Sequence, residues 1–261
     1  MKMMDQEEAI KKKSSVTSGE KPVLEITNLE KSFGSQKVLN DISLNLYNEE
    51  NLVVLGKSGS GKSVLIKCIV GLLQAESGEI KVFGESVDAL NRSKLSLMRQ
   101  KIGFLFQSGA LYDSMTVKQN LEFPLRRIKK ELTEDGINEK VMEVLENVGL
   151  ADALNKMPSQ LSGGMRKRIS LARTIIVDPK IMLYDEPTTG LDPVTSHEIS
   201  SLINEVKEKY KTSSIIITHD IACARTTADR IIMLNDGKVY QEGTFEELLK
   251  SEDELIKPFF I

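Results

Sequence analysis

A glycine-rich run that ends in lysine and serine has the residue types and spacing of a phosphate-binding loop. The run, which fits the pattern G-x-x-x-x-G-K-S, is Gly56-Lys57-Ser58-Gly59-Ser60-Gly61-Lys62-Ser63. Glycines let backbone N–H groups close around a phosphate, and a helix that begins at the loop adds its dipole. The run therefore predicts a nucleotide-binding loop, with Lys62 on the β- and γ-phosphates and the Ser63 hydroxyl on Mg²⁺.

The flanks of this phosphate loop argue against a chance match by an ordinary Gly/Ser turn. Residues 52–55 are apolar throughout, as in a strand buried on both faces, and apolar residues at helical spacing follow the loop. A strand, a glycine loop and a helix in this order place backbone N–H groups at the helix start, where an anion binds.

Two adjacent carboxylates, Asp185 and Glu186, end another apolar run, residues 181–184. Side chains alternate along a strand, so these two carboxylates should point in different directions. We expect Asp185 to face Mg²⁺ and Glu186 to act as the general base on the attacking water. Taken alone, the pair could be an acidic turn at a strand end, but the phosphate loop favours the catalytic interpretation.

A second anion site is predicted from Leu161-Ser162-Gly163-Gly164-Met165, which precedes a helix. A hydroxyl, two glycines and a helix N-terminus together favour a negatively charged group. Ser162 can also cap that helix, but capping does not explain the paired glycines. A single chain has no use for two separate γ-phosphate sites unless the second one serves another molecule.

This segment resembles the signature motif of the ABC ATPase family, whose other motifs follow in the family's order over about residues 22–245. In that family the signature motif contacts the ATP held by the opposite subunit. The resemblance implies an ATPase that uses ATP and Mg²⁺ and that forms an ATP-dependent head-to-tail dimer with a second copy of itself. The residues implied to contact ATP in trans are Ser162, Gly163, Gly164 and Asp192.

Four single residues take their roles from the same resemblance. Phe33 matches the aromatic residue that stacks on adenine, and Gln107 matches the glutamine that binds ATP and senses Mg²⁺ and the transporter partner. Asp192, in Gly190-Leu191-Asp192, matches the loop that communicates across the dimer. His219 matches the catalytic histidine that contacts the γ-phosphate. The implied Mg²⁺ ligands are Ser63, Gln107 and Asp185.

Stretches that begin at two of these motifs, and the end of the chain, are similar to the Mla-type phospholipid-transport ATPases. They are residues 107–126, residues 165–173 and the end of the chain, residues 251–260. The similarity implies phospholipid transport for outer-membrane lipid asymmetry, with an integral-membrane permease and an MCE-domain lipid-binding protein as partners. It also implies a place at the cytoplasmic face of the inner membrane, through the permease. Met165 departs from the family's usual glutamine, so any polar contact from that side chain is absent.

The sequence discriminates to different degrees against three other functions. A P-loop kinase would share the phosphate loop but has no need of a signature motif. An ABC ATPase that acts on ribosomes or DNA would usually carry two cassettes or a long coiled coil, and only 100 positions separate Lys62 from Ser162. The ATPase of another importer, for instance one for amino acids, is poorly discriminated by the sequence.

The strands and helices expected around these motifs indicate an α/β fold. We expect a P-loop NTPase (ABC ATPase) core with an antiparallel β subdomain and an inserted α-helical subdomain at about residues 90–165. Parallel strands buried on both faces are expected where short runs are apolar throughout; these are residues 52–55, 181–184 and 215–217. Antiparallel strands are expected where apolar and polar residues alternate, at residues 24–26 and 42–46. A hairpin at 235–238 and a final helix near 245–255 complete the expected elements.

Composition places limits on the partners. The 261 residues include 35 basic and 38 acidic side chains, a net charge of −3, which gives no reason to expect a nucleic acid. Cys68 and Cys223 have no neighbours at metal-ligand spacing and are expected in the core. Residues 1–20 are charged and Ser-rich, so we expect a disordered tail, not a signal peptide, ahead of an ABC ATPase domain over 21–261. No apolar run is long enough to span a membrane, which favours a cytoplasmic protein.

Overall fold

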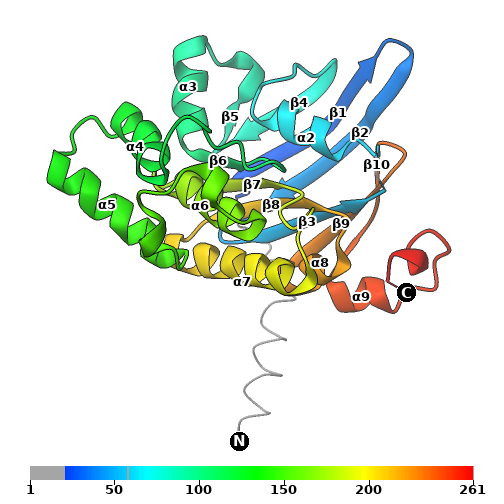
Figure 1. Cartoon of the computed structure of the whole chain (residues 1–261). Coiled ribbons are helices and arrows are strands. Elements are labelled where there is room, and N and C mark those ends of the chain that lie inside the picture. Colours follow the sequence, from blue (N-terminus) through cyan, green and yellow to red (C-terminus); the bar gives the residue numbers. More distant parts are fainter. Residues whose placement is uncertain (1–20, 58, 261) are drawn as a thin grey trace, which may run out of the picture.

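The structure, a computed structural model, describes residues 21–57 and 59–260 (Figure 1). The tail expected over residues 1–20 and the phosphate-loop residue Ser58 lie outside the described residues. In the part of the chain that the structure describes, no helix has both the length and the apolar character needed to cross a membrane.

A six-stranded sheet with the strand order β10-β9-β3-β8-β7-β6 forms the centre of the molecule. Its strands are β3 (Asn51–Gly56), β6 (Ile102–Leu105), β7 (Ile181–Asp185), β8 (Ser213–Thr218), β9 (Arg230–Asn235) and β10 (Lys238–Gly243). Neighbours pair in parallel from β9 through β6. The three apolar runs predicted as parallel strands are therefore confirmed, as β3, β8 and β7. The predicted hairpin is also confirmed, because β10 runs antiparallel to β9.

Both faces of the central sheet are covered, and β3 shows why its run is apolar throughout. Val53 and Leu55 belong to one core cluster, and Leu52 and Val54 belong to the other. Alternate side chains of a strand point to opposite faces, so a strand covered on both sides needs an apolar residue at every position. The helices that contribute buried residues to these two clusters include α2 (Lys62–Ile69), α6 (Gly163–Ile175), α7 (Pro193–Tyr210) and α8 (Ile221–Thr227).

A second, antiparallel sheet with the order β2-β1-β4-β5 confirms the predicted β subdomain. Its strands are β1 (Leu24–Phe33), β2 (Gln36–Leu46), β4 (Ser77–Val82) and β5 (Glu85–Ser86), followed by the short helix η1 (Val87–Ala89). Apolar residues of β1 and β2 share a core cluster with α2 and β3, which ties this sheet to the start of the phosphate loop.

The predicted helical subdomain at about 90–165 needs a correction, because that range is not helical throughout. It holds α3 (Arg92–Gln100), α4 (Val117–Ile128), α5 (Glu134–Asn147), η2 (Ala151–Ala153) and η3 (Pro158–Gln160), but also β6, which pairs with β7 in the central sheet. Residues 102–105 are mostly buried, so their pairing with β7 outweighs the helix-forming composition around them. Figure 1 shows α4 and α5 (green) projecting to one side of the molecule, away from α9.

The predicted final helix near 245–255 is also too long. Helix α9 (Phe245–Leu249) stops after five residues, and η4 (Lys257–Phe259) follows a short loop. The Asp253 carboxylate accepts a hydrogen bond from the backbone N–H of Leu255 at 2.8 Å. Local bonds of this kind compete with the helical pattern, which explains the interruption.

Candidate active site

The phosphate loop connects β3 to α2, and its lysine folds back over it. Lys62 Nζ donates hydrogen bonds to the carbonyl oxygens of Gly56, at 2.6 Å, and Lys57, at 3.0 Å. Burial lowers the pKa of Lys62, while the charges of Glu186 and Asp185 act in the opposite direction. The ammonium group therefore lies inside the loop and close to two carboxylates.

The last glycine of the loop has a steric reason to be glycine. Gly61 has φ +97°, and a Cβ placed there would lie 2.7 Å from the backbone oxygen of Val38. Gly61 also precedes α2 without a side-chain cap. The first N–H groups of a helix have no partner within the helix, so this end of α2 can receive an anion. The Ser60 hydroxyl beside it is buried and has no hydrogen-bond partner among the described residues.

A hydroxyl and a carboxylate meet at the end of the loop. Ser63 Oγ donates a hydrogen bond to Asp185 Oδ1 at 3.1 Å, and the two residues come from α2 and from the end of β7. Burial raises the pKa of Asp185, and the hydrogen bond from Ser63 partly offsets this. The pair presents two oxygen atoms, the ligand type that Mg²⁺ prefers.

Glu186 follows Asp185 but contacts different partners. Its backbone turns into the left-handed region, at φ +51°, while its N–H still donates to Ile217 O at 2.9 Å. Its Oε2 lies 2.8 Å from His219 Nδ1 and accepts a hydrogen bond from Thr189 Oγ1 at 3.2 Å. The turn thus directs the Glu186 carboxylate toward the loop after β8.

One cavity of about 670 Å³ brings Lys62, Ser63, Glu186 and His219 together, whereas Asp185 is not among its lining residues. The residues that line it are Val38, Lys57, Gly59, Gly61, Lys62, Ser63, Val64, Gln107, Glu186 and His219. Gln107 reaches the cavity because β6, which ends two residues earlier, lies beside β7 in the sheet. Motifs that are far apart in the sequence therefore meet at the carboxyl ends of neighbouring parallel strands, where ligands bind in open α/β sheets.

The signature segment lies elsewhere in the chain's fold. Ser162 caps α6 by accepting a hydrogen bond from the Met165 N–H at 3.2 Å, and Ser162 and Gly163 are exposed. Neither Ser162, Gly163 nor Gly164 lines the cavity around Lys62. A Cβ on Gly164 would lie only 2.5 Å from Thr195 Cγ2, at the start of α7. The signature segment therefore packs closely against the segment that contains Asp192.

Asp192 caps α7 and is itself exposed. Its Oδ1 accepts hydrogen bonds from the N–H groups of Val194, at 3.1 Å, and Thr195, at 3.0 Å. The Thr195 hydroxyl donates to Asp192 Oδ2 at 2.5 Å, and these bonds lower the pKa of Asp192. Asp192 and the signature segment thus form one exposed surface next to the start of α7.

A family model described as "ABC transporter" matches residues 39–189. The chain belongs to the ABC transporter family. The match covers the phosphate loop, Gln107, the signature segment and the two carboxylates.

This ABC ATPase is similar to curated transport proteins with different named substrates. It is 40% identical over 236 residues to a probable ribonucleotide transport ATP-binding protein, mkl, of Mycobacterium leprae, which covers 90% of this chain and 68% of that protein. It is 38% identical over 231 residues to the intermembrane phospholipid transport system ATP-binding protein MlaF of Haemophilus influenzae, covering 88% and 87%. It is 35% identical over 235 residues to the methionine import ATP-binding protein MetN of Legionella pneumophila, covering 90% and 68%.

Among solved structures, the dimeric post-hydrolysis state of the ATP-binding cassette MJ0796 bound to ADP and Pi matches with a TM-score of 0.77 and 31% identity. The match covers 85% of this chain and 98% of that one. The chain is thus an ATP-hydrolysing subunit of an ABC transporter.

Phe33, the residue expected to stack on adenine, lies at the edge of this arrangement. It ends β1 and is 48% exposed, and Lys31 Nζ lies 5.4 Å from its ring centroid. It does not line the cavity that contains Lys62. An exposed ring on this ABC ATPase leaves a face available for stacking, so the adenine contact stays a prediction.

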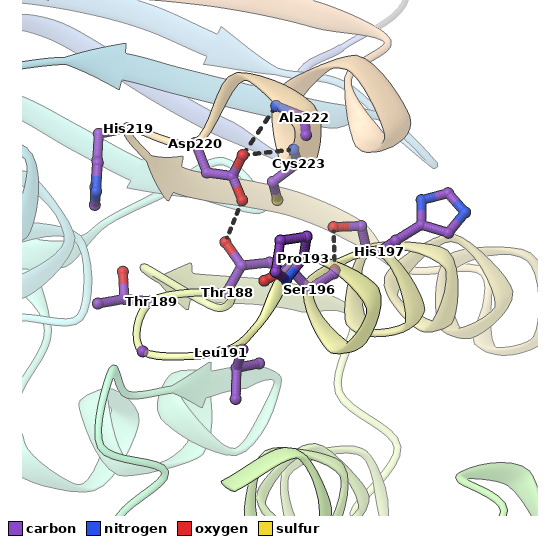
Figure 2. A pocket seen from close by; sticks show the side chains of 12 residues that line it. Thr188, Thr189, Leu191, Pro193, Ser196, His197, His219, Asp220, Ala222 and Cys223 are labelled. Carbon is purple, nitrogen blue, oxygen red and sulfur yellow. Dashed lines mark hydrogen bonds between the residues drawn. The ribbon is translucent and has the colours of Figure 1, made fainter.

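A second cavity of about 540 Å³ is also lined by His219 and lies against the start of α7 (Figure 2). Asp220 organises its wall: its carboxylate accepts a hydrogen bond from Thr188 Oγ1 at 2.8 Å and caps α8 through the Ala222 N–H at 2.9 Å. His197, the histidine to which the sequence assigned no role, also lines this cavity, but its ring points away from His219.

Two residues near the site could not be singled out from the sequence. Thr189 contacts Glu186 only because the chain turns back after β7. Lys167 is 5% exposed, and its Nζ donates to the carbonyl oxygen of Gln107 at 2.6 Å. The sequence holds one signal for Lys167: it falls on the apolar side of α6, although lysines are rarely buried.

Proposed function

We propose that two copies of this ABC ATPase pair head to tail around two ATP molecules and use hydrolysis to drive phospholipid transport through a membrane permease. The observation that best supports the pairing is the separation within one chain of Lys62 from the exposed signature residues. A second γ-phosphate site that does not reach the chain's own cavity is useful only to another copy. In the proposed pair, Ser162, Gly163 and Gly164 contact the ATP of the partner, beside Asp192.

In the proposed mechanism each group acts from the position described above. Lys62 holds the β- and γ-phosphates, and backbone N–H groups of the loop surround them. Glu186 accepts a proton from the attacking water, and His219, 2.8 Å from it, orients the γ-phosphate and the carboxylate. The Ser63 hydroxyl and Asp185 carboxylate, 3.1 Å apart, fit Mg²⁺ as oxygen ligands, and Gln107 completes the proposed set. Bound Mg²⁺ would offset the negative charge of the phosphates.

A groove of about 530 Å³ between α3, α4 and α6 supports a permease partner. Three exposed aromatic residues line it, namely Phe106, Tyr112 and Phe123. Arg99, Arg127 and Arg173 line it as well, and none of the described lining residues is acidic. Exposed aromatic and arginine side chains are typical of binding surfaces, so we infer that a segment of the permease with apolar and acidic side chains binds here.

Phospholipid is the proposed substrate because the segment after Gln107, which lines this groove, is similar to the Mla-type ATPases. The likeness to MlaF, over most of both chains, supports this assignment. An MCE-domain lipid-binding protein is proposed as a further partner. The ATPase itself is proposed to lie at the cytoplasmic face of the inner membrane, held there by the permease. Ribonucleotide transport and methionine import are the alternatives that the names of the other relatives favour.

The pairing can be tested with Gly163→Asp. A Cβ at Gly163 meets only Leu191 Cδ2, at an ordinary 3.5 Å, so the variant should fold, and an aspartate suits the first turn of α6. The new carboxylate would repel the γ-phosphate of the partner's ATP. We expect ATP binding to persist and hydrolysis and ATP-dependent pairing to be lost; normal pairing would contradict the proposal.

The substrate can be tested by purifying the chain from membranes with its partners. We expect a permease and an MCE-domain protein with bound phospholipid. Recovery with a periplasmic solute-binding protein for methionine would assign the chain to methionine import. Recovery in a complex that transports ribonucleotides would assign it to the other alternative.

A further inference from the structure

Lys167 is a buried cation that contacts two functional segments at once. It is 5% exposed, and its Nζ donates a hydrogen bond to the carbonyl oxygen of Gln107 at 2.6 Å and makes a longer contact, at 3.4 Å, with that of Glu186. Burial lowers its pKa to about 8, while the charges of Asp185 and Glu186 favour the charged form. The ammonium group therefore bridges the main chains of two residues of the site.

Packing alone does not account for an ammonium group at this position. Removing a charged group from water is costly unless its hydrogen bonds and nearby charges compensate for the loss. A methionine has a similar length and would fill the same space without that cost. The two carbonyl contacts are therefore the reason that we assign to the lysine.

The same face of α6 holds the rest of the loop that begins at Gln107. Arg173 Nη1 donates to the carbonyl oxygen of Ala110 at 2.7 Å, and its Nη2 donates to that of Gly109 at 3.3 Å. Between them, a Cβ on Gly109 would lie 2.5 Å from Ser170 Oγ. Residues 167, 170 and 173 repeat at helical spacing, so one side of α6 follows the loop over two turns.

This loop has two surfaces, one toward the nucleotide cavity and one toward the groove. Gln107 lines the cavity around Lys62, whereas Phe106 and Tyr112 line the groove. The carbonyl oxygen that Lys167 holds therefore belongs to the segment that connects the cavity to the groove. The other acceptor of Lys167 belongs to Glu186, whose carboxylate lies at His219.

We propose that Lys167 is a positioning residue that links the Gln107 loop to the main chain of Glu186, so that a partner bound in the groove controls the placement of the catalytic carboxylate. The identity of that partner rests on the proposed function. The link between Lys167, Gln107 and Glu186 lies within one chain and does not depend on the transported substrate.

The test compares Lys167→Met, Lys167→Gln and Arg168→Met in the full-length chain. Arg168 lies next to Lys167 on α6 and pairs with Glu198 instead, at 2.7 Å, so its variant is a matched control. We expect Lys167→Met to lower kcat for ATP by about tenfold or more with KM changed less than about twofold, because the lysine positions Glu186 and the Gln107 loop while Lys62 and the phosphate loop stay in place. Lys167→Gln, which keeps a donor, should retain an intermediate kcat, and Arg168→Met should keep the wild-type value.

A second measurement follows the loop itself. Amide hydrogen exchange in Lys167→Met should increase over residues 106–110 and stay unchanged in α7. A wild-type kcat in Lys167→Met, or an effect confined to KM, would overturn the proposal. Unchanged hydrogen exchange over residues 106–110 in Lys167→Met would also overturn it, whatever the kcat of the variants. None of these outcomes bears on pairing or on the transported substrate, which the Gly163→Asp and membrane-purification experiments test separately.

Discussion

The Nδ1 atom of His219 lies 2.8 Å from Oε2 of Glu186, although 33 residues separate the two in the sequence. The contact joins the end of β7 to the end of β8, which are neighbours in the central sheet. Thr189 Oγ1 donates to the same oxygen atom at 3.2 Å. The Glu186 carboxylate is thus held from two sides at the wall of the cavity around Lys62.

Replacement of Glu186 by glutamine should separate ATP binding from hydrolysis. The amide keeps the size of the side chain but cannot accept a proton from water, so we expect kcat to fall by about a hundredfold or more. ATP affinity should change little, because Lys62 and the loop remain intact. Phosphate release and equilibrium ATP binding measure the two quantities. Thr189→Val, which removes one hydrogen bond to the carboxylate, should have a much smaller effect; normal turnover of Glu186→Gln would contradict the assigned role.

The two signature glycines should differ in their effect on stability. A methyl group on Gly164 would lie 2.5 Å from Thr195 Cγ2, whereas one on Gly163 has ordinary contacts. We expect Gly164→Ala to lower the free energy of unfolding by about 1–3 kcal/mol and Gly163→Ala to cost less, as measured by urea denaturation. Thr195→Ser removes Cγ2 and keeps the hydroxyl that bonds Asp192, so it should restore part of the loss. Equal stability of the two alanine variants would refute this packing argument.

The groove prediction can be tested by charge reversal. Arg127 is exposed and lines the groove, so Arg127→Glu should prevent recovery of the permease from membranes while the isolated chain keeps its ATPase activity. Arg92→Glu, which changes an exposed residue of α3 outside the groove lining, serves as the control. Recovery of the permease with both variants would show that the contact lies elsewhere.

Both thiols should be unreactive in the folded chain. Burial raises the pKa of Cys68 and of Cys223 to about 11 from an ordinary value of 9.0. The folded state holds these two protons more tightly than the unfolded chain does. The protonated thiols therefore contribute to the free energy of unfolding below about pH 9, and this contribution should be lost as the pH rises from about 9 through 11. We expect slow alkylation of the native chain at pH 8 and rapid alkylation after denaturation. Rapid labelling of the native chain would contradict the burial of both residues.

The buried parallel strands could be predicted from the sequence, because each depends on a local pattern. Residues 52–55 are apolar at every position and precede a glycine loop, and the structure places them in the middle of the sheet as β3. The composition of residues 90–165 predicts a helical subdomain that is too wide, because β6 is a four-residue strand within this helix-rich region. Residues 102–105 form a strand because they pair with β7, and no pattern within those residues indicates this pairing.

Contacts made by main-chain atoms were the part of the site that could not be predicted. Lys167 binds carbonyl oxygens of Gln107 and Glu186, and carbonyl oxygens are the same at every residue. The close approach of Gly164 to Thr195 likewise depends on how α6 and α7 meet. Side-chain chemistry could be inferred from residue types, whereas these distances needed the fold.

The most direct test of the central claim, that each hydrolytic site is built from two copies, is to mix two inactive variants. Lys62→Ala removes the phosphate lysine, and Gly163→Asp blocks the signature surface. A mixed pair contains one site with both defects and one intact site, so mixing should restore phosphate release, up to about half of the wild-type rate when every pair is mixed. A chain that carries both substitutions, mixed with either single variant, should restore none. If the two single variants stay inactive when mixed, although mixed pairs form, the site is not shared and the account is wrong.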